Sequence, residues 1–160
     1  MGQSVWLDFI RRDLTQSGEL ARLVAQDGVR GLTSNPAIFE KAMAGGAEYA
    51  DAISAAARAH RDAKAAYETL AIEDIRAAAD VMKTVYDSSA GADGFVSLEV
   101  SPLLANDTQG TLAEARRLWS AVARRNLMIK VPGTPAGIPA IRQLIGEGIS
   151  VNVTLLFANS

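Results

Sequence analysis

The chain has 160 residues, 49% of them hydrophobic and 21% charged, a composition that suits one globular domain with a hydrophobic core. Its 18 acidic and 16 basic residues give a net charge of −2, which argues against a nucleic-acid partner. The absence of cysteine excludes disulfide and thiolate chemistry, and with no membrane-length apolar run or signal peptide we expect a cytoplasmic protein without membrane contact.

The amino-terminal part of the chain predicts two strands with a helix between them. Residues 4–9 form a short apolar run that contains one acid and predict the first strand. Ser17 has the residue type of a helix cap, and the leucines after it predict a helix to about residue 26. Residues 29–36 predict the second strand and its exit. There Asn35 precedes Pro36. A proline disfavours helical geometry in the residue before it, and it often stands at the first position of a helix.

Residues 37 to about 90 form an alanine-rich segment that is predicted to be helical. Because it is too long for the single helix of a strand–helix–strand unit, we expect two or three helices. His60, the single histidine, lies in this segment and is predicted to occupy a helix surface rather than a catalytic site. A stripe of apolar residues at helical spacing is expected to face the core: Ile72, Ile75, Ala79, Met82, Val85 and Tyr86.

The second half of the chain predicts three more strands, at residues 94–100, in the run around Lys130, and at residues 149–157. Strand and helix thus alternate five times, which is typical of a parallel sheet with helices outside it. The pattern fits either an open, doubly wound α/β sheet or the first five units of an eight-stranded TIM-type (β/α)8 barrel. No glycine-rich phosphate loop of the Gly-x-Gly-x-x-Gly or Walker type follows a strand, so a nucleotide-binding sheet is poorly supported.

The helices of this half have recognisable start signals. A polar loop over residues 101–110 is expected to end at a capping box, Thr111 to Glu114, which begins one helix. Thr134 and Pro135 are expected to begin the last helix, which ends near Gly146 or two residues later.

Lys130 follows three apolar residues and precedes Val131-Pro132-Gly133, which places it near the carboxyl end of a buried strand. A buried ammonium group is costly, so such a lysine must pair with an acid, reach solvent or lose its proton. A lysine whose pKa is lowered in this way is a nucleophile that can form a Schiff base with a carbonyl compound. The alternative is a lysine at a strand end that extends into solvent.

Each predicted strand carries a polar or ionisable side chain in its later half, although parallel strands buried on both faces have little reason to hold one. In a barrel these positions converge on the catalytic face. Structural alternatives stay open: Asp8 as a cap or turn residue, Asn35 as a turn residue, and Asn152 with Thr154 as partners of backbone groups. The full set is Asp8, Thr33, Asn35, Glu99, Lys130, Asn152 and Thr154.

This set suits the chemistry of a nucleophilic lysine. After the amine attacks a ketone, protons must move on and off oxygen several times. Two carboxylates in different surroundings could divide that work, one as a base and one through a water molecule. Asn and Thr side chains can orient substrate hydroxyls and that water. We therefore interpret the set as the site of a Schiff-base enzyme.

Two segments resemble the signatures of the transaldolase family: Gly31-Leu32-Thr33-Ser34-Asn35-Pro36 and Ile129-Lys130-Val131-Pro132-Gly133-Thr134-Pro135-Ala136-Gly137-Ile138. The resemblance extends from Trp6-Leu7-Asp8 to Asn152-Val153-Thr154-Leu155-Leu156-Phe157, essentially the whole chain. It implies a TIM-type (β/α)8 barrel with the Schiff-base lysine at Lys130. It also implies transfer of a dihydroxyacetone unit between sugar phosphates in the pentose phosphate pathway, with no metal or organic cofactor.

The resemblance further implies substrates and residue roles. The donor would be sedoheptulose 7-phosphate or fructose 6-phosphate, and the acceptor glyceraldehyde 3-phosphate or erythrose 4-phosphate. Asp8 would take the hydroxyl proton during carbon–carbon cleavage, while Glu99 and Thr154 would handle the water and protons of carbinolamine dehydration. The residues that position the substrate and the enamine would be Thr33, Asn35 and Asn152.

Members of this family continue for three further strands, which carry the groups that hold the substrate phosphate. Nothing in this chain matches that segment, so no phosphate-binding residue is assigned. We therefore expect residues 1–160 to form a partial barrel domain of a longer protein. An incomplete barrel would leave a sheet edge and an apolar interior open, which favours self-association.

Other interpretations stay open on the sequence alone. A class I aldolase-type lyase would use the same lysine and carboxylates but release the three-carbon unit, although the Thr-Ser-Asn-Pro signature favours transfer. A non-catalytic module that binds a sugar phosphate would need no reactive lysine. The same is true of a structural fragment that pairs with a complementary chain.

Overall fold

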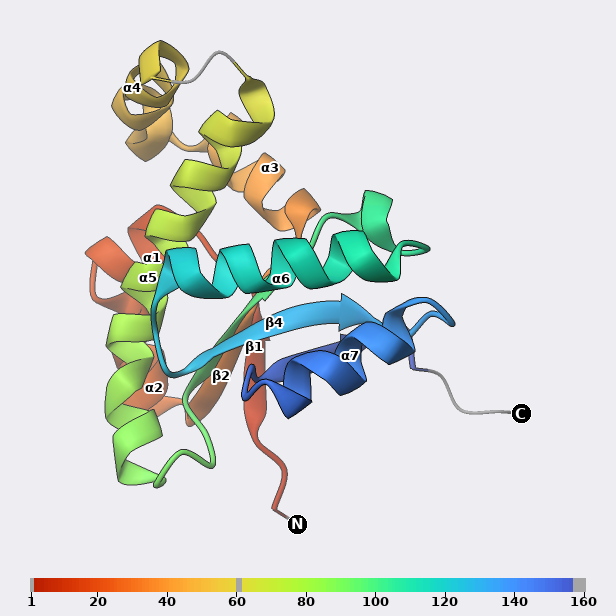
Figure 1. Ribbon diagram of the computed structural model, residues 1–160. Helices are drawn as coiled ribbons and strands as arrows, with labels where there is room; N and C mark the ends of the chain where they lie inside the picture. The colour runs from red at the N-terminus through yellow and green to blue at the C-terminus, as the bar shows by residue number, and fades with distance from the viewer. Residues whose placement is uncertain (1, 60–61, 157–160) are drawn as a thin grey trace.

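Five parallel strands form one sheet whose order follows the chain (Figure 1). The computed structural model describes residues 2–59 and 62–156. The strands are β1 (Val5–Asp8), β2 (Val29–Thr33), β3 (Phe95–Glu99), β4 (Leu127–Pro132) and β5 (Val151–Thr154). Each strand pairs with its neighbours in sequence, so every helical connection returns the chain to the next position of the same sheet.

The strand order decides between the two predicted architectures. In an open, doubly wound sheet the order reverses at a switch point, whereas the order β1-β2-β3-β4-β5 never reverses. Side chains on the inner face also reach strands that are not neighbours: Asn152 of β5 donates to Ser97 of β3 across β4. Such a contact requires a strongly curled sheet. The prediction of a partial TIM-type barrel is confirmed.

Helices cover the outer face of the curled sheet (Figure 1). Their bounds, with η for a 3-10 turn, are α1 (Arg12–Gln16), α2 (Glu19–Gln26), α3 (Pro36–Gly45), η1 (Ala47–Tyr49), α4 (Ala50–Ala59), α5 (Ala63–Ser88), η2 (Pro102–Leu104), α6 (Thr108–Val122) and α7 (Gly137–Gly146). The long helix α5 packs on β2 and β3, α6 packs on β4, and α7 packs on β4 and β5. The described part of the alanine-rich segment thus holds α3, α4 and α5, as the prediction of two or three helices allows.

The hydrophobic core lies between the outer face of the sheet and the helices. Ile75, Ala79 and Met82 of the predicted stripe are fully buried there. The strands contribute every second residue to the same core, for example the fully buried Val96 and Ile129. The residues between them therefore face the inside of the curled sheet, which is where the polar side chains lie.

The base of the inner face is filled by Trp6. In the β1–β2 register Trp6 is paired with Gly31, and a Cβ added to Gly31 would lie 2.2 Å from the Trp6 ring. Glycine is therefore required at this position, because the indole takes the space that a side chain would occupy. With the amino end of the interior filled in this way, the later strand positions remain for polar groups.

Helix α6 begins earlier than predicted. It starts at Thr108, because Asp107 is the N-cap and its carboxylate accepts a hydrogen bond from the Gly110 N–H at 2.9 Å. The predicted capping box from Thr111 to Glu114 is therefore wrong. The Thr111 hydroxyl donates instead to the Leu104 carbonyl oxygen, and the Glu114 carboxylate accepts a hydrogen bond from the Ser101 N–H.

Two other helix starts also differ from the prediction. Gly18, not Ser17, is the N-cap residue of α2, which begins at Glu19, and Gly18 has a left-handed φ of 82°. The Ser17 hydroxyl oxygen still accepts a hydrogen bond from the Glu19 N–H at 3.3 Å. Helix α7 begins at Gly137 rather than Thr134, whose hydroxyl accepts a hydrogen bond from the Gly137 N–H at 2.9 Å. Thr134 therefore precedes the helix as a turn residue instead of beginning it.

The last strand is shorter than the predicted run over residues 149–157. Strand β5 ends at Thr154, because Leu155 has a φ of 62° and leaves the extended conformation. Phe157, the end of the predicted run, lies outside the described residues.

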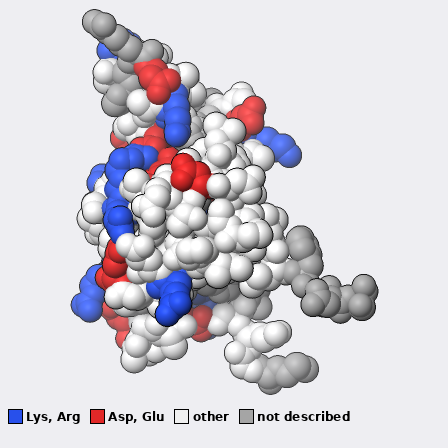
Figure 2. All heavy atoms as spheres, turned by 45° about the vertical axis from the view of Figure 1, so that its right-hand side comes forward, with Lys and Arg blue, Asp and Glu red and all other residues white. Residues whose placement is uncertain are grey.

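Apolar side chains lie exposed along the open side of the sheet. Within the described residues β1 pairs only with β2, and β5 only with β4, so both outer strands have a free edge. The exposed apolar residues near these edges and on α7 are Val5, Phe9, Ile138, Ile145, Leu155 and Leu156. Figure 2 shows a face with few charged side chains, which gather along its left margin and top. Across residues 2–59 and 62–156, no helix is long and apolar enough to cross a membrane.

Candidate active site

Polar side chains from three neighbouring strands meet near the carboxyl end of the inner face. Lys130 of β4 is paired in register with Glu99 of β3 and with Asn152 of β5. Residues in register on parallel strands point to the same face, so the three side chains form one row. The strand periodicity that buries Ile129 and Val131 against the helices is what turns Lys130 inward.

Lys130 is enclosed and paired. Its side chain is 13% exposed, against 61% for Lys64 and 64% for Lys83. The ammonium nitrogen lies 3.4 Å from Glu99 Oε2 and donates to the carbonyl oxygen of Ser34 at 3.3 Å. Lys130 is thus accommodated by pairing with an acid, and it does not extend into solvent.

Glu99 contacts both the amine and an open space. It lines a cavity of about 260 Å³ between β3, α5 and α6, and Tyr67 of α5 lines the same cavity. Burial, and after it the charge of Glu99, raises the pKa of Tyr67 to about 12. The Glu99 side chain is 18% exposed. Its carboxylate therefore lies between the Lys130 amine and the cavity.

Ser97 joins the row to β2, although it is not among the site residues predicted from the sequence. It is fully buried, its hydroxyl oxygen accepts a hydrogen bond from Asn152 Nδ2 at 3.0 Å, and its carbonyl oxygen accepts one from the Ser34 hydroxyl at 2.9 Å. Ser34 in turn supplies the carbonyl that binds Lys130. The signal was present in the sequence, since Ser97 and Glu99 are two residues apart and share one face of a strand.

Thr33 and Asn35 stand at the end of β2 in different local roles. The Thr33 hydroxyl oxygen is buried and has no hydrogen-bond partner among the described residues, a costly state unless a ligand or water supplies one. Asn35 is the N-cap of α3, and its Oδ1 accepts a hydrogen bond from the Ile38 N–H at 2.9 Å. This bond leaves the Asn35 side-chain NH2 group to donate elsewhere.

Asp8 and Thr154 lie apart from the central row. Asp8 is exposed at the end of β1, in register with Thr33. Thr154 is in register with Pro132, beyond Lys130 along the sheet. In the part of the chain that the structure describes, neither side chain forms a hydrogen bond or ion pair with Lys130. Both therefore stand at the rim of the open inner face.

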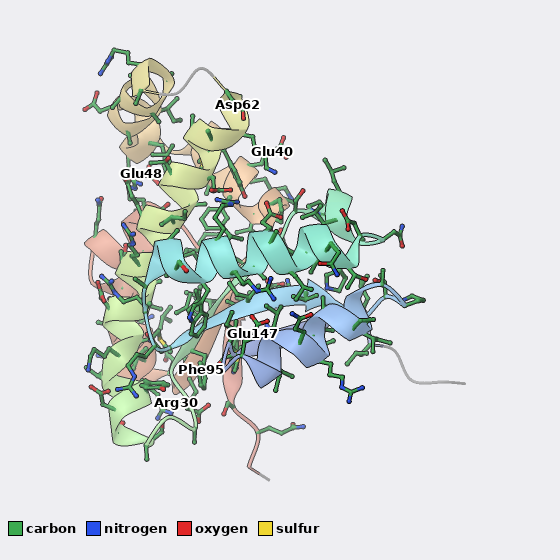
Figure 3. The ribbon with its side chains drawn as sticks, viewed as in Figure 1. Arg30, Glu40, Glu48, Asp62, Phe95 and Glu147 are labelled. Atoms are coloured by element: carbon green, nitrogen blue, oxygen red, sulfur yellow. The ribbon has the colours of Figure 1, made fainter. Side chains whose placement is uncertain are left out.

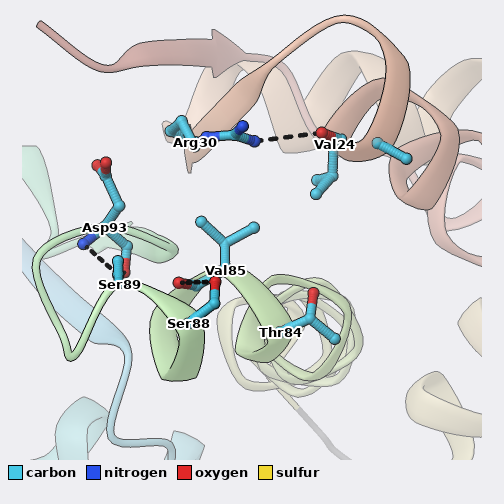
Figure 4. A pocket seen from close by; sticks show the side chains of 8 residues that line it. Val24, Arg30, Thr84, Val85, Ser88, Ser89 and Asp93 are labelled. Carbon is cyan, nitrogen blue, oxygen red and sulfur yellow. Dashed lines mark hydrogen bonds between the residues drawn. The ribbon is translucent and has the colours of Figure 1, made fainter.

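A second pocket lies at the opposite end of the sheet, around Arg30 at the start of β2 (Figure 4). Arg30 donates to the carbonyl oxygens of Val24 and Val29, and the Ser88 and Ser89 hydroxyls donate to carbonyl oxygens at the end of α5. These polar groups are thus engaged with local backbone. Figure 3 shows Arg30 at the lower, amino end of the strands. In barrels of this type the residues at the amino end contribute to stability, and the active site lies at the carboxyl end. This pocket is not the candidate active site.

No cluster of His, Cys, Asp or Glu that could hold a metal ion occurs in residues 2–59 and 62–156. His60 lies outside the described residues, so its predicted place on a helix surface is not described.

The chain is similar to known proteins along essentially its whole length. A family model described as Transaldolase/Fructose-6-phosphate aldolase matches residues 5–160. A transaldolase of Neisseria gonorrhoeae is 57% identical over 160 residues, which are 100% of this chain and 45% of that protein. Transaldolases of Thiobacillus denitrificans and Trichodesmium erythraeum are 54% and 50% identical over 158 residues, 99% of this chain and 44% and 42% of those proteins. The chain spans less than half the length of these relatives.

Proposed function

The chain belongs to the transaldolase/fructose-6-phosphate aldolase family, and we propose that the protein transfers a dihydroxyacetone unit from a ketose phosphate to an aldose phosphate. The observation that carries the proposal is the placement of Lys130. It is an amine with 13% exposure on the inner face of the sheet, 3.4 Å from Glu99 and in register with Asn152. An enclosed amine beside a carboxylate suits covalent catalysis through a Schiff base.

In the proposed reaction Lys130 is the nucleophile. Its amine gives up a proton and attacks the ketone carbon of the substrate, which forms a carbinolamine. The carbinolamine hydroxyl gains a proton and leaves as water, and an iminium ion remains. Glu99 is the carboxylate nearest to the amine, and with Thr154 it moves these protons through a water molecule.

Cleavage of the carbon–carbon bond is assigned to Asp8. The bond between the carbons α and β to the iminium carbon breaks, and its electron pair forms the double bond of an enamine as the iminium electrons move to nitrogen. At the same time Asp8 accepts the proton of the hydroxyl on the β carbon, which departs as an aldehyde. The enamine then adds to the acceptor aldehyde, and Asp8 returns the proton to the new hydroxyl. A substrate bound to Lys130 would extend across the inner face towards β1, where Asp8 stands exposed.

The remaining predicted residues position the substrate. The buried Thr33 hydroxyl needs a partner that a substrate hydroxyl can supply, and the Asn35 NH2 group is not used by its cap bond. Asn152 is held by Ser97 beside Lys130, where its amide can orient the enamine. No residue of this chain is assigned to the substrate phosphate.

The wider context follows from the proposed reaction. The donor would be sedoheptulose 7-phosphate or fructose 6-phosphate and the acceptor glyceraldehyde 3-phosphate or erythrose 4-phosphate, as in the pentose phosphate pathway of the cytoplasm. Because the iminium ion accepts the electron pair and side chains carry the protons, the proposed chemistry needs no metal or organic cofactor.

Borohydride trapping tests the proposal. The protein is incubated with fructose 6-phosphate and borohydride, and the added mass is located by peptide mapping. A three-carbon adduct on Lys130 is expected, because it records both the Schiff base and the carbon–carbon cleavage. Lys130→Met should remove the adduct, whereas Lys83→Met, which changes an exposed lysine on α5, should leave it in place. An adduct on another lysine would contradict the site.

Two further measurements separate the alternatives. If the chain alone gives no adduct, the same test is made on a hybrid that joins it to the remaining part of the Neisseria gonorrhoeae relative. Labelling of Lys130 only in the hybrid would mean that the chemistry lies in this chain and the rest of the barrel completes the site, while labelling in neither would favour a non-catalytic module. Incubation with and without an acceptor aldehyde then distinguishes a transferase from a lyase, which releases dihydroxyacetone without an acceptor.

A further inference from the structure

Two hydrogen bonds in opposite directions join the loop after β3 to the loop after β4. The Thr134 hydroxyl, two residues after β4, donates to the carbonyl oxygen of Ala105 at 2.5 Å. The Thr108 hydroxyl, at the start of α6, donates to the carbonyl oxygen of Ala136 at 2.7 Å. We name this reciprocal pair the threonine latch. Neither threonine has a part in the reaction proposed above.

The direction of the Thr134 bond is fixed by a third group. The same hydroxyl oxygen accepts a hydrogen bond from the Gly137 N–H at 2.9 Å. A hydroxyl has a single hydrogen, and with the Gly137 N–H on one lone pair that hydrogen is directed to the Ala105 carbonyl. Thr134 therefore connects the start of α7 with the loop that precedes α6, and a residue without a hydroxyl would lose both bonds.

The latch lies just beyond the place where β3 and β4 part. Their last residue pair is Glu99 with Lys130, and the Val100 N–H donates to the Lys130 carbonyl oxygen at 3.1 Å. After this bond the two chains continue into their loops. Strand ends open more readily than strand centres, because fewer bonds hold them. The latch supplies a connection at the end of the pairing where the lysine and its carboxylate stand.

The loop after β3 is also fixed at its beginning. Glu114 of α6, which is 10% exposed, accepts a hydrogen bond from the Ser101 N–H at 2.8 Å. Its charge is balanced by Lys64 at 3.5 Å and Arg117 at 3.4 Å. With Ser101 tied to α6 at one end and Thr108 bonded across to the other loop at the far end, a displacement of one loop is passed to the other.

We propose that Thr108 and Thr134 are positioning residues that make the loops after β3 and β4 move as one unit and thereby hold Glu99 and Lys130 in their relative places. This inference rests on the proposed function for its catalytic consequence only. The coupling between the loops is a property of the fold and can be measured without any activity.

Hydrogen exchange followed by mass spectrometry tests the coupling. Thr134→Val should raise amide exchange about fivefold in residues 101–107, on the other loop, as expected for the loss of the single hydrogen bond that joins Thr134 to that loop. Thr108→Val should do the same in residues 133–137. Thr134→Ser and Thr108→Ser keep the hydroxyl and should exchange like the wild type. Thr84→Val is the matched control, because Thr84 is exposed and its hydroxyl donates to the Val81 carbonyl oxygen within α5.

The catalytic consequence is tested by the rate of borohydride trapping with fructose 6-phosphate. Both valine variants should lower the rate at saturating sugar about fivefold and leave the half-saturating concentration unchanged, since the change displaces reacting groups rather than binding contacts. The serine variants should restore the rate, a rescue that a general loss of structure would not give.

Each outcome decides one of the two claims. If borohydride gives no adduct on Lys130 of the wild type, in this chain or in the hybrid, the proposed function fails. The threonine latch is then tested by amide exchange in the opposite loop alone. If the valine variants raise exchange only in their own loop, or if exchange in α5 rises equally and shows general unfolding, the latch is overturned. If cross-loop exchange rises but trapping is unchanged, the positioning role is overturned.

Discussion

The two ends of the sheet use polar side chains in different ways. At the amino end Asn126, which is 4% exposed, donates to the carbonyl oxygens of Ala79 and Gly94, each at 2.9 Å. At the carboxyl end the Thr33 hydroxyl is buried without a partner among the described residues, and Lys130 is held by one carbonyl and one carboxylate. Satisfied groups stabilise the fold, whereas groups with unused bonding capacity can act on a ligand.

The largest expected effect comes from the carboxyl end. Lys130→Met should abolish borohydride trapping entirely, while the free energy of unfolding in urea changes by less than about 1 kcal/mol. The change in stability is small because Glu99, the partner left behind, keeps 18% of its side chain exposed and can be hydrated. A loss of several kcal/mol would show instead that the lysine is a structural group and that the contrast between the two ends is false.

The next largest effect is expected from a substitution at the amino end of the sheet. Asn126→Ala should lower the free energy of unfolding by about 2 kcal/mol, because two buried hydrogen bonds disappear. Trapping at Lys130, measured well below the unfolding temperature, should be unchanged. Arg125→Ala, at the exposed neighbouring position, is the control and should change stability by less than about 0.5 kcal/mol. Lost trapping in a folded Asn126 variant would contradict the division of roles.

Thr33→Val is expected to change stability and reactivity in opposite directions. Valine has nearly the same shape and removes a buried hydroxyl that has no partner, so the free energy of unfolding should rise by up to about 1 kcal/mol. Trapping should fall several-fold, because the substrate loses a hydrogen-bond partner. Thr33→Ser, which keeps the hydroxyl, should retain most of the trapping. Unchanged trapping in the valine variant would remove Thr33 from the site.

The contrast between the ends also explains which features could be predicted from the sequence. The alternation of strands and helices follows from local periodicity, and the inward row at Lys130 follows from the two-residue period of neighbouring strands. Contacts that depend on how tightly the sheet curls leave no such signal. The carbonyl of Ser34 reaches Lys130 although 96 residues separate them, and the buried Asp74 pairs with Arg12 across 62 residues.

The errors in the helix starts have a similar cause. Asp107 and Thr111 are both good N-cap residues, and they stand four positions apart in one polar loop. Thr111 is drawn away because its hydroxyl donates to the Leu104 carbonyl, and Glu114 because it accepts from the Ser101 N–H. Local signals therefore offered two starts, and contacts with the loop after β3 selected between them.

The smallest expected effect comes from an ion pair at the amino end of the sheet whose groups are hydrogen-bonded but not buried. Arg116 of α6 donates two hydrogen bonds to Glu147, just after α7, and these bonds lower the pKa of Glu147 from 4.5 to about 2. A carboxyl group whose pKa is lowered by folding stabilises the folded state at pH values above its pKa in the unfolded chain. This contribution is lost as the pH falls towards 2. The pair is well bonded but exposed, so water and salt weaken it. Glu147→Gln should therefore lower stability slightly at pH 7, and its decline of stability between about pH 5 and pH 2 should be shallower than in the wild type by the same small amount. High salt should have the same effect on the wild type, and parallel declines for the two proteins would show that the pair contributes nothing.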